Sequence, residues 1–363
     1  MARGLSDRVL IVSLGTTTGW LVNEAELTAS LRRLGVEHDV VRVRLGPQRH
    51  LRRTSIWALV DAIEAVGARR ALRRGLRSGK PSAVIALSTT AALLLPLRRL
   101  REAGVEVAVR VDCPSAVSRS GPQNAGQRAL ERRRLREATL TVATGPRSAA
   151  LLSPLSPRVE VVPVPVEPPA GARGDGDPGT DVVTYSADPA NKGLDLVCRA
   201  WWALGSLTAG RLLQVTGVRP ERGRRLLLRR GVAEPPNLRW VGELPHERHV
   251  ELLRSAAAYV SASEWEGAGI TQLEALASGT PLVTTPSRGA YEAYPIAAAL
   301  DPELVTAERD EDELSRALGA ALRLSDRSRR AYAAAAARPL REFSREAADA
   351  ALRDRVLPAL RDG

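Results

Sequence analysis

Two acidic residues bracket a glycine-containing turn in the second half of the chain. The segment SEWEGAGITQLEALASGTPLV, residues 263–283, places Glu266 and Glu274 eight positions apart, with Gly267 and Gly269 between them. Glycine admits backbone conformations closed to other residues and lets a ligand approach the chain closely. Carboxylates accept hydrogen bonds only, and neighbouring sugar hydroxyls donate them. The pattern therefore favours a site for a sugar-containing ligand.

A helix is expected to begin directly after this turn, at 271–278, because Gly279 and Pro281 follow as stop signals. The free N–H groups and positive dipole end of such a helix suit a diphosphate. A sugar–diphosphate–nucleoside would satisfy both features. Two simpler interpretations stay open here: Glu274 could close a capping box with Thr271, and Glu266 could be a solvated loop acid.

The elements that must position these residues follow an alternating pattern. Strands are expected at 9–14, 39–43, 83–87, 105–111 and 140–143, with helices at 22–34, 56–76, 90–103 and 128–137. After a break, strands are expected at 181–185, 211–216, 237–241, 258–260 and 281–285, with helices at 194–207, 247–256, 310–324 and 344–357. This alternation predicts parallel sheets with helices on both faces, and ligands at the carboxyl ends of the strands.

The length of 363 residues favours two domains. The segment VVPVPVEPPAGARGDGDPGT, at 161–180, is rich in proline and glycine, which indicates a linker. We therefore predict an α/β protein of two Rossmann-like, doubly wound domains. The predicted parts are an acceptor-binding domain at 1–165, a linker at 166–180, a nucleotide-sugar-binding domain at 181–340 and a C-terminal helix at 341–363.

Composition sets limits on partners and location. The net charge of +12 comes almost entirely from arginine, because Lys80 and Lys192 are the only lysines. Arginine-rich segments at 69–80, 132–136 and 224–230 are usually solvated helix faces, but they could attract an anionic membrane surface or acceptor. A nucleic-acid partner is not expected, because aromatic residues that could stack on bases are few.

No secretory or membrane-spanning pattern stands out. The longest apolar run, 83–97, is shorter than the roughly 18–20 residues that cross a bilayer. We expect a cytoplasmic protein, with association at the cytoplasmic face of a membrane left open. Cys113, Cys198 and the four histidines show no metal-ligand spacing, so no metal site is predicted.

Three segments of the second half resemble the retaining glycosyltransferases of family four. The segment at 261–283 resembles that family's signature P-S-x-x-E-G-F-G-L-x-x-L-E-A-M-A-x-G-x-P-V-V. The segment NKGLDL, at 191–196, resembles its K-G-x-D-x-L motif, and 237–253 resembles the strand that lines the nucleotide base. The resemblance implies a GT-B fold, in which two Rossmann-like domains face each other across a cleft. It also implies metal-independent sugar transfer from a nucleotide donor, with retention of anomeric configuration.

The resemblance also implies roles for individual residues. Lys192 and the helix N-terminus would stabilise the leaving diphosphate, Glu266 would face the donor sugar, and Glu274 would bind the ribose hydroxyls. Asp112, at the end of an expected strand, could contact the donor sugar or the acceptor, or could only shape the turn before a proline. The remaining residues expected around the donor are Gly267, Gly269, Ile270, Thr271, Gly242, Glu243 and Gly15.

The segment at 162–167 lacks the family's usual N-G-V-D turn, and the chain also departs from the family pattern at two positions expected near the donor. Ala187 stands where an arginine usually contacts the diphosphate, and no histidine lies between His50 and His246, where the family usually has one near the donor sugar. These departures leave open an inactive scaffold. The basic charge leaves open a nucleic-acid-binding protein, a class that includes glycosyltransferases acting on modified DNA. The expected donor is UDP- or GDP-linked with no separate cofactor. The acceptor stays open among lipid-linked molecules, glycans and small molecules.

Overall fold

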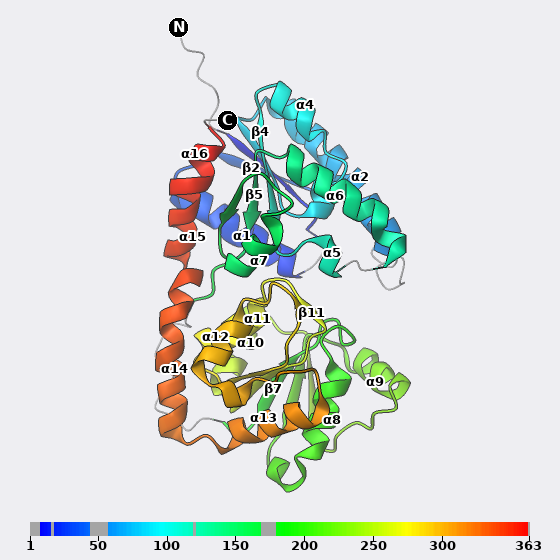
Figure 1. Ribbon diagram of the computed structural model, residues 1–363, viewed down its shortest axis with the longest axis vertical. Helices are drawn as coiled ribbons and strands as arrows, with labels where there is room; N and C mark the ends of the chain where they lie inside the picture. The colour runs from blue at the N-terminus through cyan, green and yellow to red at the C-terminus, as the bar shows by residue number, and fades with distance from the viewer. Residues whose placement is uncertain (1–7, 16–17, 44–56, 119–120, 168–178, 362–363) are drawn as a thin grey trace. The chain divides into compact units, whose positions relative to one another are not determined.

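The chain folds into two compact units. The computed structural model describes residues 8–15, 18–43, 57–118, 121–167 and 179–361 (Figure 1). The first unit comprises Met1–Pro165 together with Ser344–Gly363, and the second comprises Val166–Phe343. The last part of the chain therefore belongs with the N-terminal half. Of the predicted linker, residues 168–178 lie outside the described residues, and Val166 is buried in the core of the second unit.

The first unit is built on a six-stranded parallel sheet. The strand order is β2-β1-β3-β4-β5-β6. The strands are β1 (Val9–Ser13), β2 (His38–Arg42), β3 (Ala83–Ala86), β4 (Glu106–Val111), β5 (Leu140–Ala143) and β6 (Val159–Val161). The helices are α1 (Thr18–Arg33), α2 (Trp57–Gly75), α3 (Thr89–Ala92), α4 (Leu97–Glu102), α5 (Ser115–Ser118), α6 (Ala125–Glu137), α7 (Pro146–Leu152), α15 (Arg345–Ala351) and α16 (Leu357–Ala359).

Both faces of this sheet are buried. Along β1, Leu10 and Val12 pack in one apolar cluster, while Val9 and Ile11 pack in the other. The second cluster also contains residues of the C-terminal helices, which continue from α15 to α16 through a π-helical turn at Leu352–Val356. A continuous apolar strand of this kind is typical of a parallel sheet covered on both sides.

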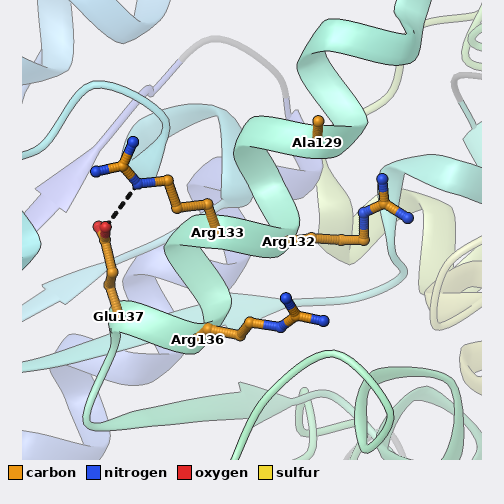
Figure 2. Close-up of a pocket in the computed structure, with 5 residues that line it drawn as sticks. All are labelled: Ala129, Arg132, Arg133, Arg136 and Glu137. Atoms are coloured by element: carbon orange, nitrogen blue, oxygen red, sulfur yellow. Dashed lines mark hydrogen bonds and ion pairs between the residues drawn. The ribbon is translucent and has the colours of Figure 1, made fainter.

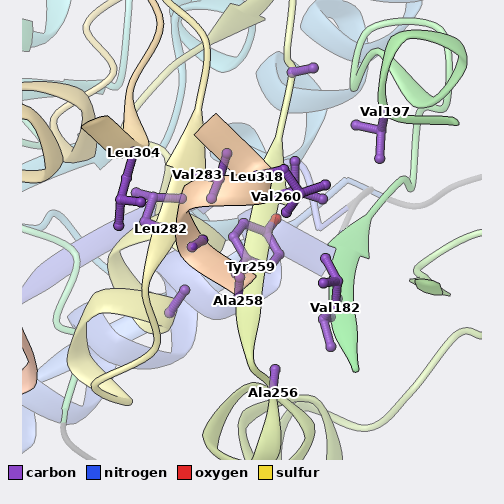
Figure 3. Close-up of a cluster of buried hydrophobic side chains, with 14 of the residues drawn as sticks. Val182, Val197, Ala256, Ala258, Tyr259, Val260, Leu282, Val283, Leu304 and Leu318 are labelled. Carbon is purple, nitrogen blue, oxygen red and sulfur yellow. The ribbon is translucent and has the colours of Figure 1, made fainter. Parts of the chain in front are cut away.

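The second unit has a five-stranded parallel sheet of order β12-β10-β7-β8-β9 and a separate two-stranded pair, β11-β13. The strands are β7 (Val182–Tyr185), β8 (Leu213–Thr216), β9 (Leu238–Gly242), β10 (Ala258–Ser261), β11 (Trp265–Glu266), β12 (Leu282–Thr284) and β13 (Arg288–Gly289). The helices are α8 (Leu194–Ala203), α9 (Pro220–Arg229), α10 (His246–Ser255), α11 (Ile270–Ala277), α12 (Ala293–Leu300), α13 (Glu311–Arg323) and α14 (Asp326–Leu340). Side chains from three of these strands meet in its core, around Val182, Tyr259 and Val283 (Figure 3).

Two predicted helices are shorter in the structure. The helix expected at 90–103 is divided into α3 and α4, because Pro96 lacks the N–H that a continuous helix needs. The helix expected at 194–207 ends at Ala203, shortly before Gly205, which has a left-handed φ of 55°. No helix in the described part of the chain has the length and apolar character needed to cross a bilayer.

Candidate functional site

The turn between the two acidic residues begins at the carboxyl edge of the second unit's sheet. We call residues 266–269 the signature turn; it leads from β11 into α11. Gly269 caps α11 in the left-handed conformation, with φ 72°, and a Cβ there would lie 2.9 Å from the ring of Tyr291. Within the part of the chain that the structure describes, no side chain caps the start of this helix. The capping interpretation of Glu274 is therefore wrong, because glycine backbone takes the position that a capping threonine would need.

Glu266 is the centre of a buried polar cluster. Its Oε1 atom accepts from Lys192 Nζ at 2.5 Å, from Ser263 Oγ at 2.7 Å and from Gln272 Nε2 at 2.9 Å. Burial alone would raise the pKa of Glu266, but the charge of Lys192 and these hydrogen bonds lower it below its ordinary value. Glu266 is thus held as a carboxylate and is not a solvated loop acid, since only 7% of the residue is exposed.

Lys192 is positioned by the residues on either side of it. The side-chain amide of Asn191 donates to Trp265 O at 3.1 Å, and its oxygen accepts from Trp265 N at 3.2 Å. Gly193 has a left-handed φ of 63°, and a Cβ there would lie only 2.1 Å from Ala262 O. Only glycine fits this close approach. The contacts of Asn191 and Gly193 therefore hold Lys192 beside the signature turn.

Glu274 lies on α11 next to a histidine of α10. Its Oε1 atom is 3.5 Å from His246 Nδ1, and its side chain is 13% exposed. Burial raises the pKa of Glu274 to about 7. A carboxyl group with such a pKa gains from ligand hydroxyls that replace its lost water. This fits the hydroxyl-binding role that the sequence predicts for it.

Tyr185 lies at the same site, although no sequence motif indicated it. The centre of its ring lies 5.9 Å from Lys192 Nζ and 5.7 Å from the ring of His249, which it meets edge-on. The ring also packs on Gly217, where a Cβ would lie 2.4 Å from a ring atom of Tyr185. Burial, followed by the charges of Glu274, Glu243 and Glu266, raises its pKa. Tyr185 therefore lies among the three predicted carboxylates. Its position at the end of β7 was the available signal, because ligands bind at the carboxyl ends of parallel strands.

The other predicted donor residues of the second unit lie on the same edge. Gly242 ends β9 with a φ of 82°, and its carbonyl accepts from Gly217 N at 2.7 Å. Glu243 follows it and is exposed. Ile270 and Thr271 form the first turn of α11. The structure thus brings together Lys192, Glu266, Glu274, the glycines of the signature turn and the end of β9.

Two predicted residues, Asp112 and Gly15, belong to the first unit. Asp112 follows β4, and its Oδ1 atom is buried without a hydrogen-bond partner among the described residues. Burial raises its pKa, against the charge of Arg110, a buried residue that donates to Asn23 Oδ1 at 3.0 Å. Gly15 follows β1 with a φ of 60°, and a Cβ there would lie 3.5 Å from the Arg42 side chain. Polar groups therefore gather at the carboxyl edge of this sheet too.

Comparisons with known proteins bear on the family of the second unit and on the fold. Residues 176–338 match the family model described as Glycosyl transferases group 1. A comparison with curated proteins gives no match. The second unit thus carries a glycosyltransferase domain of this group, and the match does not favour the inactive or nucleic-acid alternatives.

Solved structures share the fold over nearly the whole chain. Sucrose-phosphate synthase from Thermosynechococcus elongatus is 17% identical, with a TM-score of 0.76 over 98% of this chain and 99% of that one. A trehalose-6-phosphate synthase, studied for glycosyl transfer with retention, is 14% identical, with a TM-score of 0.71 over 99% of both chains. HepE from Anabaena, solved with UDP and glucose, is 12% identical, with a TM-score of 0.70 over 96% of this chain and 99% of that one. The predicted GT-B fold is confirmed.

Proposed function

Because its second unit carries a group 1 glycosyltransferase domain on a GT-B fold, we propose that this protein transfers a sugar from a UDP- or GDP-linked donor, with retention and without a metal. One observation carries the proposal. Lys192, Glu266 and the N-terminus of α11 adjoin one another, with Glu274 farther along the same helix. UDP is the first candidate, because the HepE structure contains UDP and glucose.

Each group has a distinct part in this reaction. Lys192 and the free N–H groups of α11 would stabilise the negative charge that develops on the leaving diphosphate. Glu266, held ionised, would accept a hydrogen bond from a hydroxyl of the donor sugar. Glu274 would accept from the ribose hydroxyls. Lys192 would then interact with both Glu266 and the diphosphate. Donor binding would therefore depend on the ion pair between Lys192 and Glu266.

The acceptor would use the first unit. The support is the polar edge beyond β4, where Asp112 lies near the buried guanidinium of Arg110. A carboxylate here could orient or deprotonate an attacking hydroxyl. A lipid-linked molecule, a glycan and a small molecule all remain acceptor classes compatible with this proposal.

We further propose contact between the first unit and an anionic membrane surface. On α6, Ala129, Arg132 and Arg136 line a pocket of about 480 Å³, and the two arginines extend from the same side of the helix (Figure 2). Arg133 and Glu137 also line this pocket and form an ion pair at 2.8 Å. Sedimentation with phosphatidylglycerol vesicles, compared with phosphatidylcholine vesicles, tests this. Binding that R132A/R136A does not weaken would contradict it.

The donor site is tested by nucleotide binding. A thermal-shift titration with UDP, GDP, ADP, CMP and dTDP in metal-free buffer should show selective stabilisation by one nucleotide. Lys192→Ala and Glu274→Ala should each abolish most of that shift. Lys80→Ala is the matched control, because it removes the chain's other lysine from the first unit. Full nucleotide affinity in both site variants would rule out this donor site.

A further inference from the structure

The donor site of the second unit contains more acid than base. Glu243, Glu266 and Glu274 all act on Tyr185, and Lys192, whose Nζ lies 5.9 Å from this ring, is already paired with Glu266. A nucleoside diphosphate adds further negative charge. Helix N-terminal groups offset part of it, but about half an elementary charge cannot balance a diphosphate. The site therefore calls for another cation.

Arg222 is hydrogen-bonded to the loop that carries Lys192. This arginine lies in the first turn of α9, which follows β8 at the carboxyl edge of the sheet. Its Nη1 atom donates to Ala187 O at 2.9 Å, at the start of the loop that leads to Lys192. Its Nη2 atom is 3.7 Å from Asp188 Oδ1. The guanidinium is thus placed by a backbone carbonyl and only loosely paired with an acid.

The surroundings of Arg222 leave it able to take a ligand. Its side chain is 60% exposed and that of Asp188 is 50% exposed, so their interaction is weak and solvent-screened. Ser186, one residue before Ala187, has a buried hydroxyl with no hydrogen-bond partner among the described residues. A guanidinium has five donors in a fork that matches a phosphate, so one can stay on Ala187 O while others bind an anion.

We propose that Arg222 binds the donor diphosphate as the second cation beside Lys192. The inference rests on the proposed glycosyltransferase function and deepens it. When the donor enters, Arg222 leaves Asp188, keeps its bond to Ala187 O and turns donors to the phosphate oxygens. Arg222 thereby compensates for the alanine at position 187, since it reaches the same loop from α9 rather than from within the loop.

The test compares arginines of one helix. Arg222→Ala, Arg222→Lys and Arg224→Ala are made, and calorimetry measures the dissociation constants of the preferred nucleoside diphosphate and its monophosphate. Arg224 is the matched control, because it is paired with Glu234 at 2.8 Å and lies over Trp240. We expect R222A to weaken diphosphate binding about tenfold or more and monophosphate binding less. R222K should recover part of the loss, and R224A should match the wild type.

Each other outcome overturns the inference. If the wild type binds the diphosphate and R222A binds it equally well, Arg222 is not a ligand, while the proposed function stands. If R222A weakens diphosphate and monophosphate by the same factor, Arg222 acts on the fold or the nucleoside site. If the wild type binds none of the nucleotides, the proposed function fails together with the inference.

Discussion

The ionisation of Glu274 should make nucleotide binding depend on pH. Burial raises the pKa of this carboxyl to about 7, so at pH 6 most of it is protonated and at pH 8 most is ionised. Only the carboxylate can accept from both ribose hydroxyls. We expect affinity for the diphosphate to rise roughly tenfold from pH 6 to pH 8. Calorimetry at several pH values measures this, and Glu274→Gln is the control, because the phosphate of the ligand titrates equally with both proteins.

The same carboxyl should reduce the stability of the free protein at alkaline pH. Its pKa is raised in the folded state, so the protonated form stabilises the fold below the ordinary value of 4.5, and this contribution is lost as the pH rises through about 7. Glu274→Gln, which stays neutral, should increase the free energy of unfolding by roughly 2–3 kcal/mol at pH 8. Urea unfolding at pH 5.5 should show a smaller gain. An equal gain at both pH values would assign the effect to packing instead.

At the scale of elements, the close contact between the α8 N-terminus and Ala262, directly after β10, should not tolerate a side chain at position 193. Gly193→Ala adds a Cβ at positive φ and 2.1 Å from Ala262 O, so the loop holding Lys192 must move. Gly231→Ala is the matched control, with φ 65° and no atom within 4 Å of the new Cβ. Both carry the strain of about 1 kcal/mol for a left-handed alanine. G193A should be less stable than G231A and should also lose nucleotide affinity.

The free energy of unfolding reports the effect on stability, and calorimetry reports the effect on nucleotide affinity, both on the same protein samples. Equal stability and equal affinity of the two alanine variants would mean that the loop adapts freely. The close approach of Gly193 to Ala262 would then have no part in positioning Lys192.

The elements that the sequence predicted best are those with strong apolar runs. The strand at 140–143 has the predicted bounds, because its four residues are all buried. The sequence did not indicate helix α9, because its arginines outnumber its apolar residues. Only Gly223, Leu226 and Leu227 of this helix are buried. The separate pair β11-β13 was also missed, because strands of two residues have no detectable period.

The candidate site was predictable where a local motif defines it and not where distant segments meet. Glu266 and Glu274 are in one segment, so their spacing indicated a site. The contact between Lys192 and Glu266 spans 74 positions, and the contact of Arg222 with Ala187 spans 35. Such contacts depend on strand order, in which β10 and β8 both adjoin β7. Strand order is set by packing of the whole sheet rather than by any local pattern.

At the scale of the whole molecule, the end of the chain should stabilise its beginning. Leu352 is 1% exposed and packs in the cluster that contains Val9 and Ile11, more than three hundred positions earlier. Arg33 and Asp349 add an ion pair at 2.7 Å between α1 and α15. Leu352→Ala should therefore lower the free energy of unfolding by about 2–4 kcal/mol, as for other buried leucines.

Arg353→Ala is the matched control for this last substitution, because its side chain is exposed and its partner is the adjacent Asp354. It should leave the unfolding transition unchanged. Nucleotide affinity should persist in L352A, because Lys192, Glu266 and Glu274 all belong to the second unit, which ends at Phe343. A stability of L352A equal to that of R353A would mean that the C-terminal helices do not pack on the first unit's sheet. A loss of nucleotide binding without loss of stability would mean instead that the two units do not hold their sites independently.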